Sequence, residues 1–61
     1  MKGLVIDVIR SFGGYSIYET GGMITGVFLD EDLAIRCAQE IRDILSGSDV
    51  EVNGECLVIW P

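Results

Sequence analysis

Residues 30–46 read DEDLAIRCAQEIRDILS, and this stretch decides the fold class. Its apolar residues are separated by three or four positions, which is the spacing that gathers side chains on one face of a helix. Asp30 is a residue type that favours the N-cap, and the charges of Glu31 and Asp32 suit the positive end of the helix dipole. Gly47 stands where a helix-ending glycine is expected. The sequence therefore predicts a helix over 30–46, with an apolar face formed by Leu33, Ala34, Cys37, Ala38, Ile41, Ile44 and Leu45.

β-Branched residues and paired glycines organise the chain before this helix. Residues 3–10 (GLVIDVIR) are rich in Val and Ile and predict a first strand. Residues 11–14 (SFGG) are typical of a hairpin loop, because glycine adopts a positive φ without steric cost. Residues 15–19 and 23–29 predict two further strands, joined by a turn at 20–22.

The segment after the helix predicts a last hairpin. Residues 49–52 and 55–60 flank Asn53-Gly54, and Asn-Gly is the strongest short hairpin signal. The expected order is β-β-β-α-β-β, or β-β-β-α-β if 49–52 is only a lead-in. We predict an α+β fold in which a small antiparallel sheet of four to five strands carries one helix on one face. A chain of 61 residues is expected to form a single domain over 1–61.

Two of the predicted strands, 3–10 and 55–60, are apolar on both faces, whereas a half-exposed strand alternates apolar and polar residues. One helix is about 10 Å wide and covers about two strands, so a face of each strand lacks cover. We interpret the uncovered side chains as an interface, made of Val5, Ile9, Val58 and Trp60, or of the opposite set if the register is shifted by one.

Small size supports this interpretation, because a chain of about 60 residues buries only about 60% of the surface that its unfolded form exposes. The hypothesis is a homodimer joined through the sheet, by face or by edge, or a monomer that presents this face to another protein. The competing hypothesis is that Phe12, Tyr15 and Tyr18 fold over the face within one chain.

Composition argues against several classes of function. Four basic against ten acidic residues give a formal charge of −6, which disfavours direct nucleic-acid binding. The chain has no histidine, the commonest general base and metal ligand, so we expect no catalytic site, no metal and no cofactor. No apolar run suits a membrane span or a signal peptide, so a cytoplasmic protein with reduced thiols is expected. A Cys37–Cys56 bridge stays an alternative.

Two groups of polar residues are further candidates. Arg10, Tyr15 and Tyr18 are predicted anchors for a partner or for a small anionic ligand held between subunits. Asp32, Glu40 and Asp43 lie on the outer side of the predicted helix, and with Asp49, Glu51 and Glu55 they could imitate a phosphate backbone. Ordinary solvated charge is the competing explanation.

These observations favour a small non-catalytic binding protein that forms a homodimer and engages an unknown protein target. In size and charge the chain resembles the inhibitors that bacteriophages encode against host proteins, so the resemblance implies a viral inhibitor. The alternatives are a protein that sequesters a small anionic ligand between subunits and an acidic nucleic-acid mimic.

Overall fold

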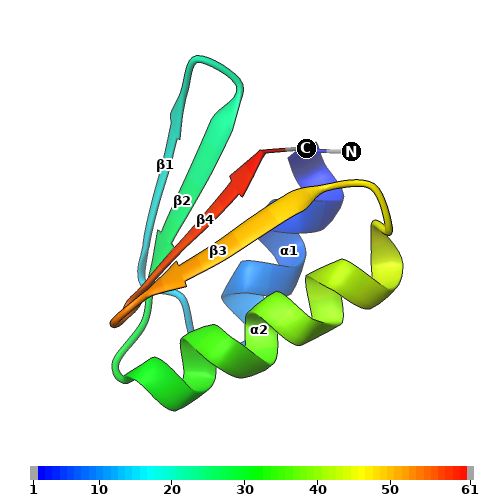
Figure 1. The fold of residues 1–61 in the computed structure, drawn as a ribbon. Helices are drawn as coiled ribbons and strands as arrows, with labels where there is room; N and C mark the ends of the chain where they lie inside the picture. Colours follow the sequence, from blue (N-terminus) through cyan, green and yellow to red (C-terminus); the bar gives the residue numbers. More distant parts are fainter. Residues whose placement is uncertain (1, 61) are drawn as a thin grey trace.

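The computed structural model describes residues 2–60, which form two helices and one four-stranded sheet (Figure 1). In chain order the elements are α1 (Lys2–Ser11), β1 (Ser16–Thr20), β2 (Met23–Val27), α2 (Glu31–Ile44), β3 (Asp49–Asn53) and β4 (Cys56–Trp60). The sheet order is β1-β2-β4-β3, and each neighbouring pair of strands is antiparallel. The predicted α+β class with a small antiparallel sheet is confirmed.

The predicted first strand at 3–10 is wrong, because this segment is the helix α1. Val5 and Ile9 are buried, Val8 and Phe12 are half-buried, and Asp7 is exposed. Buried positions four residues apart are one turn apart on a helix and share a face. The preference of Val and Ile for strands is weak, and burial of an apolar helical stripe against the sheet overrides it.

Gly13 and Gly14 end α1 and do not form the predicted hairpin loop. The Gly13 N–H donates to the Arg10 carbonyl at 3.0 Å, and the Gly14 N–H donates to the Ile9 carbonyl at 2.9 Å. This pair of bonds, with Gly13 at φ +88°, is a Schellman C-cap. A positive φ at glycine serves a helix end as well as a hairpin, so the glycine pair alone does not distinguish them.

The predicted helix over 30–46 is confirmed as α2, with slightly shorter bounds. Asp30 is the N-cap, and its carboxylate accepts a hydrogen bond from the Leu33 N–H at 2.9 Å. This bond satisfies one of the free N–H groups of the first turn and stabilises the protein by about 1 kcal/mol. Ala34, Cys37, Ala38 and Ile41 form the buried face.

Both predicted tight turns are present. Gly21 and Gly22, at φ +58° and +84°, connect β1 to β2. In the last hairpin Asn53 pairs with Cys56 and has no positive φ, so the loop is Gly54-Glu55, with φ +63° at Gly54. The turn is therefore placed one residue later than an Asn-Gly type I′ turn, and Asn53 belongs to β3.

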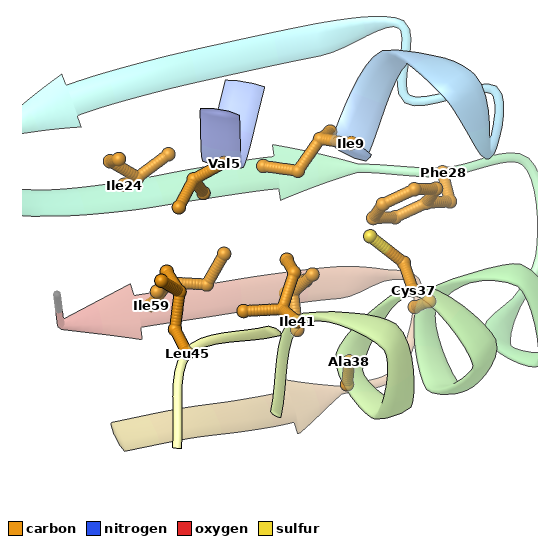
Figure 2. Close-up of a cluster of buried hydrophobic side chains, with 11 residues drawn as sticks. Val5, Ile9, Ile24, Phe28, Cys37, Ala38, Ile41, Leu45 and Ile59 are labelled. Atoms are coloured by element: carbon orange, nitrogen blue, oxygen red, sulfur yellow. The ribbon is translucent and has the colours of Figure 1, made fainter. Parts of the chain in front are cut away.

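The two helices lie on the same side of the sheet and enclose the core. α2 packs over β3 and β4, and α1 lies beside α2 against β2 (Figures 1 and 2). The eleven buried side chains come from both helices, β2, β4 and the segments next to α2: Val5, Ile9, Ile24, Phe28, Ala34, Cys37, Ala38, Ile41, Leu45, Leu57 and Ile59. The predicted interface residues Val5 and Ile9, 1% and 0% exposed, are thus core residues, because the segment that carries them is a helix on the covered face.

Candidate interaction surface

The face of the sheet that points away from the helices has no cover from the described residues 2–60. Alternate residues of a strand point to opposite faces. In β4, Leu57 and Ile59 are buried under the helices, while Val58 is half-exposed and Trp60 is 50% exposed. The same alternation in the other strands defines what we call the open face: Ser16, Tyr18, Thr20, Met23, Thr25, Val27, Asp49, Glu51, Asn53, Cys56, Val58 and Trp60.

The strand register divides the open face into three zones, which are the β1 edge, the central strands β2 and β4, and the β3 edge. Along one row, Tyr18 pairs with Thr25, Thr25 with Val58, and Val58 with Glu51. The row thus runs from the Tyr18 hydroxyl on the edge strand β1, across Thr25 and Val58 on the central strands, to the Glu51 carboxylate on the edge strand β3. The rows on either side repeat this order, with Ser16 or Thr20 at one edge and Asn53 or Asp49 at the other.

Two aromatic side chains stand out on this face. Tyr18 is 58% exposed and Trp60 is 50% exposed. Trp60 lies beside Asp49 of β3, its pairing partner. Aromatic side chains contribute large contact areas to interfaces, and the polar tips of Tyr and Trp add a hydrogen bond. The open face therefore combines an apolar centre with anchors typical of protein interfaces.

The predicted interface residues divide between the two faces of the sheet. Val58 and Trp60 lie on the open face, and their role in an interface stays a prediction, whereas Val5 and Ile9 lie in the core. The sequence interpretation missed Met23, Thr25 and Val27, the contribution of β2 to the centre of the face. Their alternation with Ile24 and Gly26 is the signal that could have identified them.

The predicted anchors Arg10, Tyr15 and Tyr18 do not converge on one site. Arg10 is exposed in the last turn of α1, in the helical layer. Tyr18 lies on the open face, on the other side of the sheet. Tyr15 precedes β1, where its N–H donates to the Val27 carbonyl at 3.0 Å and its side chain is 65% exposed. One chain therefore forms no cleft from these three side chains.

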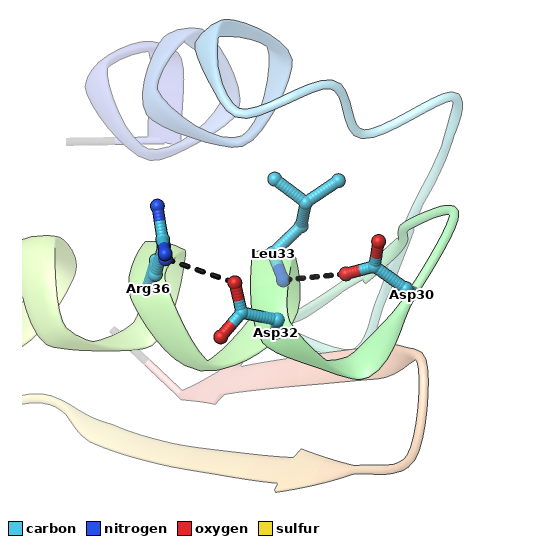
Figure 3. Close-up of polar contacts among 4 residues, drawn as sticks. All are labelled: Asp30, Asp32, Leu33 and Arg36. Atoms are coloured by element: carbon cyan, nitrogen blue, oxygen red, sulfur yellow. Dashed lines mark hydrogen bonds and ion pairs between the residues drawn. The ribbon is translucent and has the colours of Figure 1, made fainter.

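The acidic residues form two separate groups. Asp32, Glu40 and Asp43 are exposed on α2. Asp32 forms an ion pair with Arg36, with 3.0 Å between Oδ2 and Nε, on the side of the helix exposed to solvent (Figure 3). Asp49 and Glu51 instead belong to the open face, so the sheet separates the two groups. Asp49 and Glu51 point to the face of the sheet opposite α2, and the nucleic-acid mimic stays a prediction.

The two edges of the sheet differ in their cover. Arg42 of α2 donates from Nη2 to the Val50 carbonyl of β3 at 2.9 Å, which occupies a backbone acceptor at one edge strand. β1 is the other edge strand. Exposed edge strands invite pairing with further strands, and the Arg42 hydrogen bond occupies one of the β3 groups that such pairing would use.

Cys37 and Cys56 are both free thiols, in line with the expectation of reduced cysteines. Cys37 lies in the core beside Phe28 (Figure 2), whereas Cys56 is half-exposed on the open face. Burial raises the pKa of the Cys37 thiol from its ordinary value of 9.0 to about 11, and the charge of Glu40 acts in the same direction. Cys37 is therefore an unreactive core residue at neutral pH.

This pKa shift predicts that the protein loses stability in alkaline solution. The unfolded chain releases the Cys37 proton near pH 9.0 and the folded chain only near pH 11, so the unfolded state holds fewer protons between these values. The free energy of unfolding should fall as the pH rises from 9 to 11, measured by urea titration at each pH. Cys37→Ala should show a smaller decline, since every other ionising group is retained. Equal declines in both proteins would contradict the assignment.

Other kinds of site find little support in the part of the chain that the structure describes. Within residues 2–60, no group of three or more Cys, Asp or Glu side chains is close enough to hold a metal ion. None of the helices there is long and apolar enough to cross a membrane. A surface depression between α1 and α2 is lined only by apolar side chains: Leu4, Val5, Val8, Ile41, Ile44 and Leu45.

Comparison of the chain with protein-family models, with curated proteins and with solved structures found no significant match.

Proposed function

We propose that this chain is a non-catalytic protein-binding module whose working surface is the open face. The observation that carries the proposal is the exposure of Trp60 and Tyr18 beside a mainly apolar centre, with Thr25 in its middle row, that neither helix covers. Exposed apolar patches with a polar rim mark interaction sites. The carboxylates of Asp49 and Glu51 provide such a rim along β3.

The inhibitor hypothesis belongs to the same proposal. A small acidic chain that covers a functional surface of another protein blocks it without performing chemistry. The open face offers the mainly apolar centre and the aromatic anchors that such docking requires. The target is a protein, and a second copy of this chain counts among the candidates.

The proposal is tested by site-specific photo-cross-linking in the cells that produce the protein. A benzoylphenylalanine in place of Trp60 retains an aromatic group on the open face. The same group in place of Ile35, which is 40% exposed on α2, is the matched control. We expect protein adducts from position 60 and few from position 35. Introducing Val58→Asp into the chain with the position-60 probe should remove these adducts, because it places a charge in the apolar centre.

Two outcomes contradict the proposal. Adducts that form equally well from position 35 would place the interaction on the helical side. Adducts from position 60 that persist with Val58→Asp, in a chain whose circular dichroism is unchanged, would mean that the open face is not the binding surface.

A further inference from the structure

The two edge strands of the open face carry complementary hydrogen-bonding groups. β1 contributes the hydroxyls of Ser16, Tyr18 and Thr20, and β3 contributes the carboxylates of Asp49 and Glu51 and the amide of Asn53. A hydroxyl donates to a carboxylate, and a bond to a charged acceptor is stronger than one between neutral groups. One edge of the face thus offers donors and the opposite edge offers acceptors.

A surface with donors at one edge and acceptors at the other complements itself under a suitable rotation. A two-fold axis that lies between two facing sheets and runs parallel to the strands exchanges the edges of the sheet. It places β1 over β3 of the second copy, and β2 over β4 of the second copy. Tyr18 and Glu51 stand at the two ends of one row, so the Tyr18 hydroxyl faces the Glu51 carboxylate of the second copy.

We infer that the occupant of the open face is a second copy of this chain, packed face to face about a two-fold axis parallel to the strands. The inference rests on the proposed function, because it names the partner of the same surface. Twisted sheets pack face to face with their strands about 30° apart, which is compatible with this arrangement. Thr25 then meets Val58 of the second copy, and the apolar side chains of Met23, Val27 and Val58 exclude water together.

The charges disfavour a symmetric arrangement whose axis runs across the strands. A two-fold axis between the sheets that runs across the strands places β3 over β3 of the second copy. Glu51 lies in the middle row of the face and would then oppose the Glu51 carboxylate of the second copy. Like charges directly opposite each other are destabilising, whereas the parallel axis keeps the two pairs of acidic residues at opposite ends of the interface.

The size of the face sets the expected affinity. Four strands at about 4.8 Å and five residues at about 3.4 Å give a flat footprint of about 19 by 17 Å. This footprint is about 320 Å² per copy, well below the roughly 800 Å² per partner of a standard interface, so we expect weak association with a dissociation constant of about 0.1 mM or more. The dimer should form at high concentration and dissociate on dilution.

The salt dependence of binding distinguishes a second copy of this chain from a basic partner protein. Two chains of formal charge −6 repel each other, and salt screens that repulsion, so self-association should tighten as the salt concentration rises. A basic protein attracted to Asp49 and Glu51 would instead bind more weakly in salt.

A charge-swap experiment tests the arrangement. Analytical ultracentrifugation of the wild-type chain from about 1 µM to about 1 mM should show a monomer–dimer equilibrium. Tyr18→Glu places a second carboxylate opposite Glu51 of the other copy and should weaken dimerisation about tenfold or more. Adding Glu51→Lys to that variant creates a Glu–Lys pair across the interface and should restore dimerisation to within about threefold of the wild type. Tyr18 and Glu51 lie about 14 Å apart in one sheet, so restoration reports contact between copies.

Nuclear magnetic resonance on an equal mixture of isotope-labelled and unlabelled wild-type chains provides a second measurement that requires no variant. We expect intermolecular contacts between the Tyr18 ring and the Glu51 side chain. Their absence in a dimeric sample overturns the inference even if the variants fail to fold.

Three other outcomes overturn the inference. The first is a wild-type chain that stays monomeric at about 1 mM. The second is a dimer that Tyr18→Glu leaves intact, which is the result expected if the copies pair through the β1 edge. The third is a dimer that Tyr18→Glu weakens and Glu51→Lys does not restore. A monomer that still forms adducts from position 60 with another protein would overturn this inference and leave the proposed function standing. A chain that neither dimerises nor forms protein adducts from position 60 would contradict both this inference and the proposed function.

Discussion

Gly14→Ala should be among the most damaging single substitutions in this chain, although it adds only one methyl group. A Cβ at Gly14 would lie 2.4 Å from Ile9 Cγ2 and 2.9 Å from the Ile9 carbonyl oxygen. That carbonyl is fixed because it accepts the hydrogen bond that ends α1, and the Ile9 side chain is fully buried. Relief of the clash therefore requires α1 to move away from the sheet.

We expect Gly14→Ala to lower the free energy of unfolding by about 3 kcal/mol, at the upper end of the range for overpacked cores. A domain of this size has a free energy of unfolding of only about 3–9 kcal/mol, so a large fraction of the Gly14→Ala molecules should be unfolded at low urea concentrations. Urea titration followed by circular dichroism measures the change.

Gly47→Ala is the matched control, because its Cβ would have no neighbour within 4 Å and its φ is not positive. Its urea midpoint should stay close to that of the wild type. Equal midpoints for Gly14→Ala and Gly47→Ala would contradict the close packing of α1 against the 13–14 cap. Gly26 is a second position where a Cβ would approach Ile9 Cγ2, at 2.9 Å, so two glycines make room for one side chain.

Phe28→Ala should produce a comparable loss of stability by leaving a cavity. Phe28 is 0% exposed and is the largest fully buried side chain of the described residues. It lies beside Cys37 in the core (Figure 2), and its N–H donates to the Glu55 carbonyl at 2.9 Å. Truncation of a buried Phe costs about 3–5 kcal/mol, because the surrounding side chains collapse only partly into the space.

The neighbouring residue supplies the control for this second substitution. Leu29 is 74% exposed, so Leu29→Ala removes little buried surface and should change the free energy of unfolding by less than about 0.5 kcal/mol. Thermal and urea unfolding of the two variants should therefore differ widely. A Phe28→Ala protein as stable as Leu29→Ala would mean that the contacts between the segment before α2 and the core are absent in solution.

The α2 segment and the two hairpins could be predicted from the sequence because their signals are local. The N-cap Asp30 and the spacing of its apolar residues act within a few turns of α2. The glycines at 21–22 and 54 act within the four residues of a turn. The error of one residue in the last turn has the same local origin, because Asn53-Gly54 and Gly54-Glu55 both place a glycine where a positive φ is needed.

The α1 segment could not be assigned from local preference, although a helical spacing is present in it. Val5, Val8, Ile9 and Phe12 recur at helical intervals, but a high content of Val and Ile favours a strand when the segment is considered alone. The wrong strand assignment also affected the predicted interface, since it placed Val5 and Ile9 on an uncovered strand. Val58 and Trp60 do lie in a strand, because a strong turn precedes it, and their role in an interface stays a prediction.

The sequence by itself determined the α2 helix, the antiparallel hairpins and an excess of apolar side chains over what one helix can cover. Turn geometry and helix periodicity are short-range properties, so they act before the chain is folded. Only the tertiary structure decided that residues 2–11 form a second helix, because that state depends on burying Val5 and Ile9 against β2 and α2. The same packing decided which face of the sheet stays open, since two helices side by side cover one face of the sheet and none of the other.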